Sequence, residues 1–257
     1  FESCPSRPRL FLCENSSFIY LERVTFRHSP FWTTHILNST DVLIRGLQVD
    51  NPSGLPNRSS SIPFVRQWGF GPTADGIDVM HSRRVLIEDC DIHCGDDAIC
   101  LKGGFAPSTF PATSDVLARN NTIFTSCPHV ISNINGTPGF AAQSAHRNDG
   151  CGGMKLGYGT FSGIENVLFD SNRVMQAGLA IKLSSFMGEG GPLRNISFHN
   201  TRVDKAGIAI NVDLAAVRPS PACADPKRKC TDPSKLSSLD GLRIVNLSAT
   251  QSIGCYG

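Results

Sequence analysis

Apolar and polar residues alternate along most of the chain, in short runs that return in one nine-residue frame. The frame is clearest in Phe18–Phe26 and Asp41–Val49, where the alternation is interrupted once near the middle. Alternation with a period of two is typical of half-buried β-strands. The frame recurs at residues 18–26, 41–49, 84–92, 115–123, 166–174, 195–203 and, in a weaker copy, 241–249.

A second short strand is predicted after most copies, at residues 33–37, 77–79, 99–101, 154–156, 181–183 and 210–212. No amphipathic helix separates the strands, which argues against a β-α-β sheet. The copies that start at 18 and 41 are 23 residues apart, a spacing that fits one coil of a solenoid. A β-sandwich is the alternative, but it would not repeat one frame. The pattern predicts a right-handed parallel β-helix as a single domain over residues 1–257. We expect this domain to be incomplete at one or both ends.

Two longer segments, residues 50–74 and 125–152, interrupt the repeat. They are rich in Pro and Gly, and both lead into a strand that follows a copy of the frame. Loops inserted on one face of a solenoid usually mark its binding face. We therefore expect the binding site on the face of the second short strands, with loop decoration as the alternative.

Composition narrows the class of protein. The formal net charge is +2 and no apolar run approaches the roughly 20 residues of a membrane helix, so we expect neither nucleic acid nor membrane as a partner. Ten cysteines and seven N-x-S/T sequons favour a glycosylated, disulfide-bonded protein that is secreted to the extracellular space or cell wall, and we expect it to be a monomer. The chain starts at Phe1, so we expect a processed protein or a fragment. The sequons lie at Asn15, Asn38, Asn57, Asn120, Asn135, Asn195 and Asn246.

The cysteine spacing fits no zinc pattern, because no C-x-x-C pair occurs. Cys223 and Cys230 flank a short loop and are the easiest pair to bridge, and Cys4 with Cys13 is a second candidate pair. Candidates for buried thiols in strand-like segments are Cys90, Cys94 and Cys100.

Three carboxylates stand at the start of two predicted strands. Asp75 and Asp97 lie two residues before Ile77 and Ile99. Adjacent parallel strands are about 4.8 Å apart, so this shared offset places the two carboxylates at the same end of the sheet. Turn chemistry explains a single Asp-Gly pair, but with Asp96 added the cluster favours an acid–base site. Mutual repulsion would keep one carboxyl group protonated while the others stay ionised.

Positive charge is predicted close to these carboxylates. If Ile77 and Ile99 point inward, the next residue of each strand points outward, and the outward row includes Lys155 and Lys182 on adjacent strands. Two neighbouring ammonium groups repel each other, which implies an anion between them, such as a sugar carboxylate. Solvated lysines on an exposed face are the alternative. The complete outward row is Asp78, Cys100, Lys155, Lys182 and Asn211.

Six segments carry motifs of one enzyme family. Arg7-Pro-Arg-Leu10 and Ser29-Pro-Phe-Trp-Thr-Thr-His35 are similar to its R-P-R-L and S-P-F-W-x-x-H segments. Thr73–Asp78 occupies the place of the family motif N-T-D-G-I-D, and Gly95–Gly103 that of G-D-D-C-I-A-I-K-S. Gly150–Gly157 and Leu179–Lys182 occupy the places of G-H-G-G-I-x-I-G and L-R-I-K. From about Arg7 to Ala249 the chain thus resembles the polygalacturonases, pectinases with a right-handed β-helix.

The resemblance implies hydrolysis of a pectic, galacturonate-containing polysaccharide by single displacement with inversion, without a metal or other cofactor. Asp96 would be the general acid, and Asp75 and Asp97 would hold and deprotonate the attacking water. The candidates for substrate binding are Lys182, Lys155, Lys102 and Cys151, of which Lys182 would bind a galacturonate carboxylate.

The chain departs from the family at three flanking positions. Cys151 replaces the family histidine, Ala180 the arginine of R-I-K, and Ala98 the half-cystine after G-D-D. A neutral thiol at Cys151 cannot supply the charge of an imidazolium, and Lys binds a carboxylate less well than Arg. We therefore expect weakened activity, with a catalytically impaired glycan-binding relative as the alternative. A pectate lyase, which would use calcium and an arginine base, is disfavoured because the outward row contains no arginine.

Overall fold

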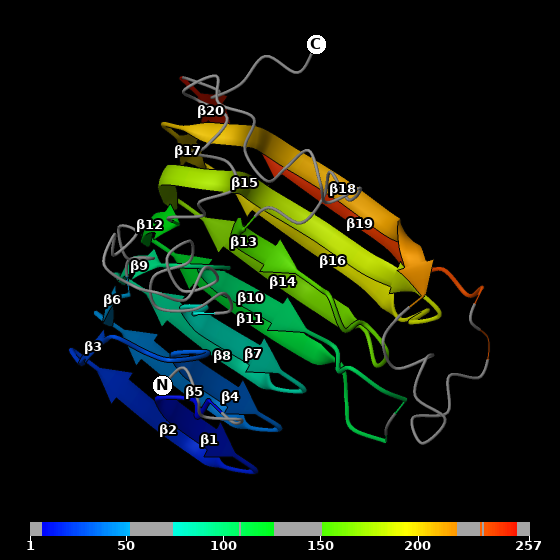
Figure 1. Ribbon diagram of the computed structural model, residues 1–257, viewed down its shortest axis with the longest axis horizontal. Helices are drawn as coiled ribbons and strands as arrows, with labels where there is room; N and C mark the ends of the chain where they lie inside the picture. The colour runs from blue at the N-terminus through cyan, green and yellow to red at the C-terminus, as the bar shows by residue number, and fades with distance from the viewer. Residues whose placement is uncertain are drawn as a thin grey trace, which may run out of the picture.

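The computed structural model describes residues 7–51, 74–107, 109–125, 151–219, 232 and 234–250. Within these residues the strands pair in parallel and stack as successive coils, from β1 and β2 at one end to β18, β19 and β20 at the other (Figure 1). The predicted right-handed parallel β-helix is confirmed. No helix in the described part of the chain has the length and hydrophobicity needed to cross a membrane.

Each coil contributes strands to three faces. Face A consists of β1 (Phe11–Glu14), β4 (Thr34–Leu37), β7 (Ile77–Met80), β10 (Ile99–Lys102), β13 (Gly152–Leu156), the second part of β15 (Arg173–Met187) and β18 (Ala206–Pro219). Face B consists of β2 (Ser17–Glu22), β5 (Thr40–Arg45), β8 (Arg83–Glu88), β11 (Thr113–Arg119), β14 (Ile164–Asp170), β16 (Pro192–His199) and β19 (Ser238–Val245). Face C consists of β3 (Thr25–Arg27), β6 (Gln48–Asp50), β9 (Asp91–Cys94), β12 (Thr122–Thr125), the first part of β15, β17 (Arg202–Val203) and β20 (Ser248–Ala249). The long strand β15 joins faces A and C into one sheet.

The nine-residue frame corresponds to one strand of face B and the beginning of face C. Its first and sixth residues adopt left-handed backbone angles in every copy, as at Phe18 (φ 58°) and Arg23 (φ 53°). Asn, Asp and Gly tolerate this conformation best, which explains why they recur there. The first positions are Phe18, Asp41, Arg84, Asp115, Asn166, Asn195 and Gly241, and the sixth are Arg23, Gly46, Asp89, Asn120, Ser171, Asn200 and Asn246.

The same geometry accounts for most of the sequons. All five sequon asparagines within the described residues have positive φ angles: Asn15, Asn38, Asn120, Asn195 and Asn246. Several donate Nδ2 hydrogen bonds to the neighbouring coil, such as Asn38 to Asn15 Oδ1 at 2.7 Å and Asn246 to Asn200 Oδ1 at 2.8 Å. Turn geometry therefore favours these asparagines without any need for glycosylation, and the sequons give little support to secretion.

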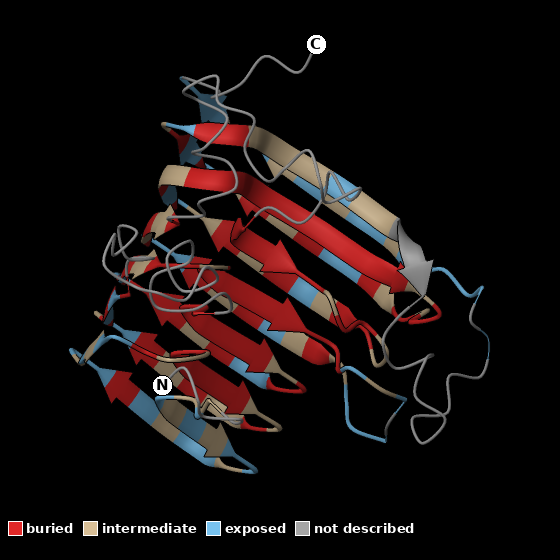
Figure 2. Ribbon diagram, viewed as in Figure 1, coloured by how far each residue is buried: buried red, intermediate tan, exposed pale blue. Residues whose placement is uncertain are grey.

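The inward residues of face A stack as predicted. Val79, Leu101, Leu156, Leu183 and Val212 pair in register on five successive coils. The first four are fully buried, whereas Val212 is 43% exposed because β18 is the last described strand of this face. Figure 2 shows the same gradient, with burial concentrated on the central coils. The carboxylate motifs therefore lie where the fold is best packed.

Most of the cysteine predictions can be compared with the structure. Cys90, Cys94 and Cys100 are buried thiols, as predicted. The candidate bridge between Cys4 and Cys13 is not formed, because Cys13 is also a thiol. The predicted pair Cys223 and Cys230, and nearly all of the predicted loop insertions 50–74 and 125–152, lie outside the described residues.

Candidate active site

The three predicted catalytic carboxylates lie together at the N-terminal ends of two adjacent strands of face A. Ile77 of β7 pairs with Ile99 of β10, and the Gly76 amide donates to the Asp97 carbonyl oxygen at 2.9 Å. This register places Asp75 opposite Asp97, as their common offset predicted. Both of these residues are buried, and Asp96 beside them is half-buried.

Asp97 is held in the ionised form. Its Oδ1 accepts a 2.7 Å hydrogen bond from the Gly152 amide, and its Oδ2 accepts one from the Lys155 ammonium group. Burial raises the pKa of Asp97, but the ammonium groups of Lys155 and Lys182 outweigh burial and hold the pKa below its ordinary value. A carboxylate that stays ionised at mildly acidic pH is a suitable base for a water molecule.

Asp96 has the opposite protonation preference. Burial, followed by repulsion from Asp97, raises the pKa of Asp96 to about 6. Adjacent residues thus supply one ionised carboxylate and one carboxyl group that is protonated at mildly acidic pH. Two carboxyl groups whose pKa values are pushed apart are the usual arrangement for general acid and base catalysis.

A buried lysine accompanies the third carboxylate. Lys102 Nζ donates to Asp78 Oδ1 at 2.6 Å and lies 3.8 Å from Asp75 Oδ2. Burial, followed by repulsion from Asp78, raises the pKa of Asp75 well above its ordinary value. Since Lys102 is itself buried and bonded to Asp78, this position does not fit its predicted role in substrate binding.

The same lysine takes the place that a metal ion would need. Asp75, Asp78 and Cys100 offer ligand atoms within 4.8 Å of one another. However, Lys102 Nζ lies 2.6 Å from both Asp78 Oδ1 and Cys100 Sγ, so a positive charge already sits among these ligands. The donor set therefore suits an internal ion pair better than a cation site.

The two lysines of the outward row are adjacent, but the anion found beside them is a carboxylate of the protein itself. Lys155 pairs with Lys182 across β13 and β15, as predicted. An external anion was predicted between the two ammonium groups. Instead, the ammonium group of Lys155 pairs with the carboxylate of Asp97. Both ammonium groups lie over the Tyr158 ring, at 4.9 and 5.1 Å from its centroid, and this ring stacks on Phe186 at 3.9 Å. Sequence reasoning missed Tyr158, which stands directly after the glycine-rich motif that carries Lys155.

All three family departures lie in the described part of the chain, and Ala98 is packed in the apolar core. The other two bear on the charge around the carboxylates. The Cys151 sulfur is disulfide-bonded, which makes the prediction of a thiol at this position wrong. It is buried, 3.5 Å from the Gly95 carbonyl oxygen. Ala180 is packed in the apolar core. Neither side chain can therefore supply a hydrogen-bond donor or positive charge to the carboxylates.

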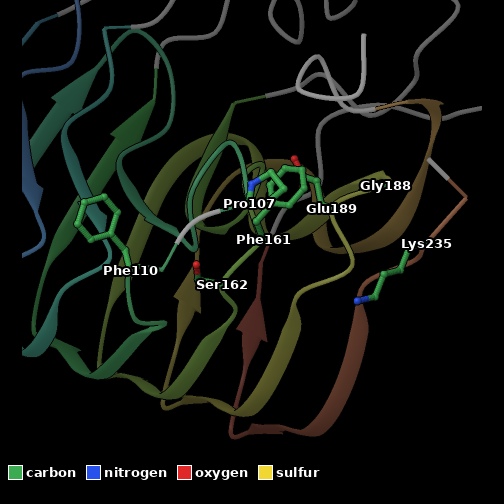
Figure 3. Close-up of a pocket in the computed structure, with 7 residues that line it drawn as sticks. All are labelled: Pro107, Phe110, Phe161, Ser162, Gly188, Glu189 and Lys235. Carbon is green, nitrogen blue, oxygen red and sulfur yellow. The ribbon is translucent and has the colours of Figure 1, made fainter. Parts of the chain in front are cut away.

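A pocket of about 300 Å³ lies at the C-terminal ends of the face A strands, away from the carboxylates at their N-terminal ends (Figure 3). It is lined by Pro107, Phe110, Phe161, Ser162, Gly188, Glu189 and Lys235. The Glu189 carboxylate accepts hydrogen bonds from the Gly159 amide at 3.0 Å, the Thr160 hydroxyl at 3.0 Å and the Ser185 hydroxyl at 3.1 Å. These bonds fix the turn that carries Tyr158, so Glu189 acts here as a structural residue.

Known proteins resemble this chain in sequence. Residues 2–123 match glycosyl hydrolases family 28, and this range includes the three carboxylates but not Lys155 or Lys182. A "Probable polygalacturonase" of Vitis vinifera is 30% identical over 100 residues, which cover 39% of this chain and 17% of that protein. A "Probable exopolygalacturonase B" of Aspergillus terreus is 26% identical over 118 residues, 44% of this chain and 22% of that protein. The matches therefore span about a fifth of the relatives' own length.

Solved structures resemble the chain over most of its length. The family 28 exopolygalacturonase of Yersinia enterocolitica superposes with a TM-score of 0.69 at 17% identity, over 93% of this chain and 34% of that one. The endo-xylogalacturonan hydrolase of Aspergillus tubingensis gives 0.63 at 14% identity, over 96% and 55%. At these identities the likeness shows a common fold, and it extends to the coils that carry Lys155 and Lys182.

Proposed function

We propose that the chain, whose residues 2–123 match glycosyl hydrolases family 28, hydrolyses glycosidic bonds in a pectic, galacturonate-containing polysaccharide. The supporting observation is the opposite protonation preference of Asp96 and Asp97. Cleavage of a glycosidic bond requires one protonated carboxyl group at the leaving oxygen and one ionised carboxylate. The two adjacent residues meet both requirements in mildly acidic solution.

The proposed mechanism is a single displacement. Asp96 donates its proton to the glycosidic oxygen, while Asp97 accepts a proton from the water that attacks the anomeric carbon. Asp75 has a raised pKa, and its buried Oδ1 makes no hydrogen bond to the described residues, so it is suited to orienting this water. The base is therefore Asp97, and Asp75 assists it by position.

The positive charges support an anionic sugar as substrate. Lys182 lies one strand beyond Lys155, and its ammonium group is held over the Tyr158 ring. Lys155 is engaged by Asp97, and the resemblance to the polygalacturonases points to Lys182 as the group that binds a galacturonate carboxylate. A polymer of this kind lies outside cells, and a disulfide at Cys151 accords with an oxidising compartment, so we propose an extracellular or cell-wall monomer.

The test is release of reducing ends from polygalacturonate, methyl-esterified pectin and xylogalacturonan, with and without EDTA. We expect release from at least one polymer that EDTA does not change. Asp96→Asn should lower kcat about a hundredfold or more, because it removes the proton donor. Asp91→Asn, which changes an exposed carboxylate of β9, is the matched control and should leave kcat unchanged.

Two outcomes would contradict the proposal. Unsaturated products that disappear with EDTA would identify a lyase. No release from any polymer, together with measurable binding of one of them, would identify a glycan-binding relative without activity.

A further inference from the structure

The register position that carries the carboxylates continues onto the two preceding coils. Phe11 pairs with Thr34, Thr34 with Ile77, and Ile77 with Ile99. Counting two residues back from each gives one row across four successive coils, and this row is Arg9, Trp32, Asp75 and Asp97. With strands about 4.8 Å apart, Arg9 lies roughly 10 Å from Asp75 along the solenoid.

Aromatic rings hold the guanidinium group of Arg9. Its Cζ lies 5.0 Å from the Trp32 ring centroid and 5.6 Å from that of Phe31, and these two rings stack at 5.1 Å. Trp32 is buried, and Lys102 Nζ lies 4.8 Å from its ring centroid. Stacking on aromatic rings is a typical way to fix an arginine while its N–H edge stays available for a planar anion.

Arg9 has no carboxylate partner in the described part of the chain, and its buried Nε makes no hydrogen bond there. Other arginines of the solenoid behave differently, since Arg45 and Arg119 both pair with Glu88. His35, edge-on to Trp32, does not compete for an anion, because burial and then the charge of Arg9 lower its pKa to about 3. A guanidinium group that is fixed by aromatic rings and has no carboxylate partner among the described residues therefore lies in line with the carboxylates.

We propose that Arg9 forms a subsite that binds the carboxylate of a uronic acid unit two coils to the N-terminal side of Asp75. This inference rests on the proposed function and extends it. Lys182 lies two strands to the C-terminal side of β10, the strand that follows Asp97. The two cations then flank the carboxylates on both sides, and the polymer lies along the solenoid axis with its scissile bond between them. Arginine suits this role because its N–H groups can bind a carboxylate in a bidentate manner.

Binding of trigalacturonate to the full chain carrying Asp96→Asn, measured by titration calorimetry, tests the subsite without turnover. Arg9→Gln in that background should weaken the Kd about ten- to hundredfold, as expected for loss of a charged hydrogen-bonded pair. Arg9→Lys should weaken binding less, since lysine keeps the positive charge but cannot bind a carboxylate through two parallel N–H groups. Arg27→Gln removes an exposed arginine of face C and is the matched control, for which the Kd should stay within about twofold. Galactotriose is the neutral probe, and its Kd should be the same for Arg9→Gln and its parent.

The inference fails if trigalacturonate does not bind the parent, if Arg9→Gln leaves its Kd unchanged, or if Arg27→Gln weakens it as much as Arg9→Gln. A second outcome concerns Arg9→Gln in the otherwise wild-type chain. If this variant lowers kcat and shifts the pH profile of kcat while KM stays constant, the inference also fails. Arg9 would then act on catalysis through His35 and Asp75 and would not bind substrate. Thermal unfolding of Arg9→Lys controls for damage to the fold. Hydrolysis of polygalacturonate by the wild type is scored separately. Binding that depends on Arg9 without hydrolysis would refute the proposed function and retain the subsite.

Discussion

Replacing Lys155 with methionine removes the ammonium group that holds Asp97 in its ionised form. The side chains of the pair are only 9% and 5% exposed, so water cannot replace the lost contact. Methionine keeps much of the apolar stem, and the main change is therefore the loss of charge. We expect the pKa of Asp97 to rise and the variant to be less stable than the wild type.

The expected loss can be estimated from the contacts that remain. Breaking a buried ion pair by removing one partner typically costs about 3–5 kcal/mol. Asp97 keeps the Gly152 hydrogen bond and the nearby charge of Lys182, so we expect the lower end, about 3 kcal/mol. In a chain of this size such a loss corresponds to a fall in Tm of about 6 °C or more.

The loss should depend on pH. A carboxyl group with a lowered pKa in the folded state stabilises the protein above its unfolded pKa of about 3.9, and this contribution disappears as the pH falls through the folded pKa. The difference in unfolding free energy between Lys155→Met and the wild type should be complete at pH 7 and shrink below about pH 4. The acidic limb of the kcat profile should move to higher pH, because Asp97 then needs a higher pH to ionise.

Urea unfolding followed by circular dichroism at pH 7 and about pH 3 measures the effect. Lys205→Met changes an exposed lysine and serves as the control. Asp97→Asn combined with Lys155→Met should recover part of the loss, because no buried carboxylate is then left unpaired. A cost below about 1 kcal/mol at pH 7, or a cost that is the same at both pH values, would refute the assignment of this pair.

Three further predictions concern neighbouring residues. Asp75→Asn should abolish most activity but raise the unfolding free energy at pH 7 by about 1 kcal/mol or more, because the raised pKa makes ionised Asp75 unfavourable in the folded state. The gain should vanish below about pH 4, where both states carry the protonated form; a loss of stability at pH 7 would contradict this. Gly152→Ala would place a methyl group 3.0 Å from Lys155 Cβ and 3.2 Å from Asp97 Oδ1. The crowding should displace the Asp97 carboxylate, so kcat should fall about tenfold or more. An unchanged kcat would show that Asp97 can move without cost. Glu189→Gln should lower the unfolding free energy by about 2 kcal/mol, because the amide turns an –NH₂ group toward backbone and hydroxyl donors; urea unfolding with no change in midpoint would contradict it.

Much of the backbone arrangement could be predicted from the sequence. Once the repeated frame indicates parallel coils, the period of two decides which residues share a face, and a slip by one residue would turn the whole apolar set outward. This is why the pairing of Asp75 with Asp97 and of Lys155 with Lys182 agrees with prediction. It is also why the row that leads back to Arg9 can be followed from the register alone.

The partners of the charged side chains could not be predicted in the same way. Lys155 was expected to bind an external anion, but its flexible stem reaches Asp97 on the neighbouring strand. Lys102 was expected at the substrate and is instead buried against Asp78. Such contacts depend on rotamers and on the competition between burial and pairing, neither of which follows from strand register.

Cysteine pairing and turn chemistry also limited the prediction. A disulfide depends on which Cβ atoms come close in space, so the spacing of Cys151 along the chain could not indicate it. The sequons overstated the case for glycosylation because left-handed turns select asparagine for their own reasons.

The most direct test of hydrolysis by Asp96 and Asp97 is the stereochemistry of the first product. Proton NMR of a polygalacturonate digest, recorded before the new reducing ends equilibrate, reports the configuration of the anomeric carbon. Direct attack by water activated at Asp97 predicts a product with the configuration opposite to that of the cleaved bond, formed at least about a hundredfold more slowly by Asp96→Asn. A product that retains the original configuration, or one with an unsaturated sugar at its end, would contradict the mechanism.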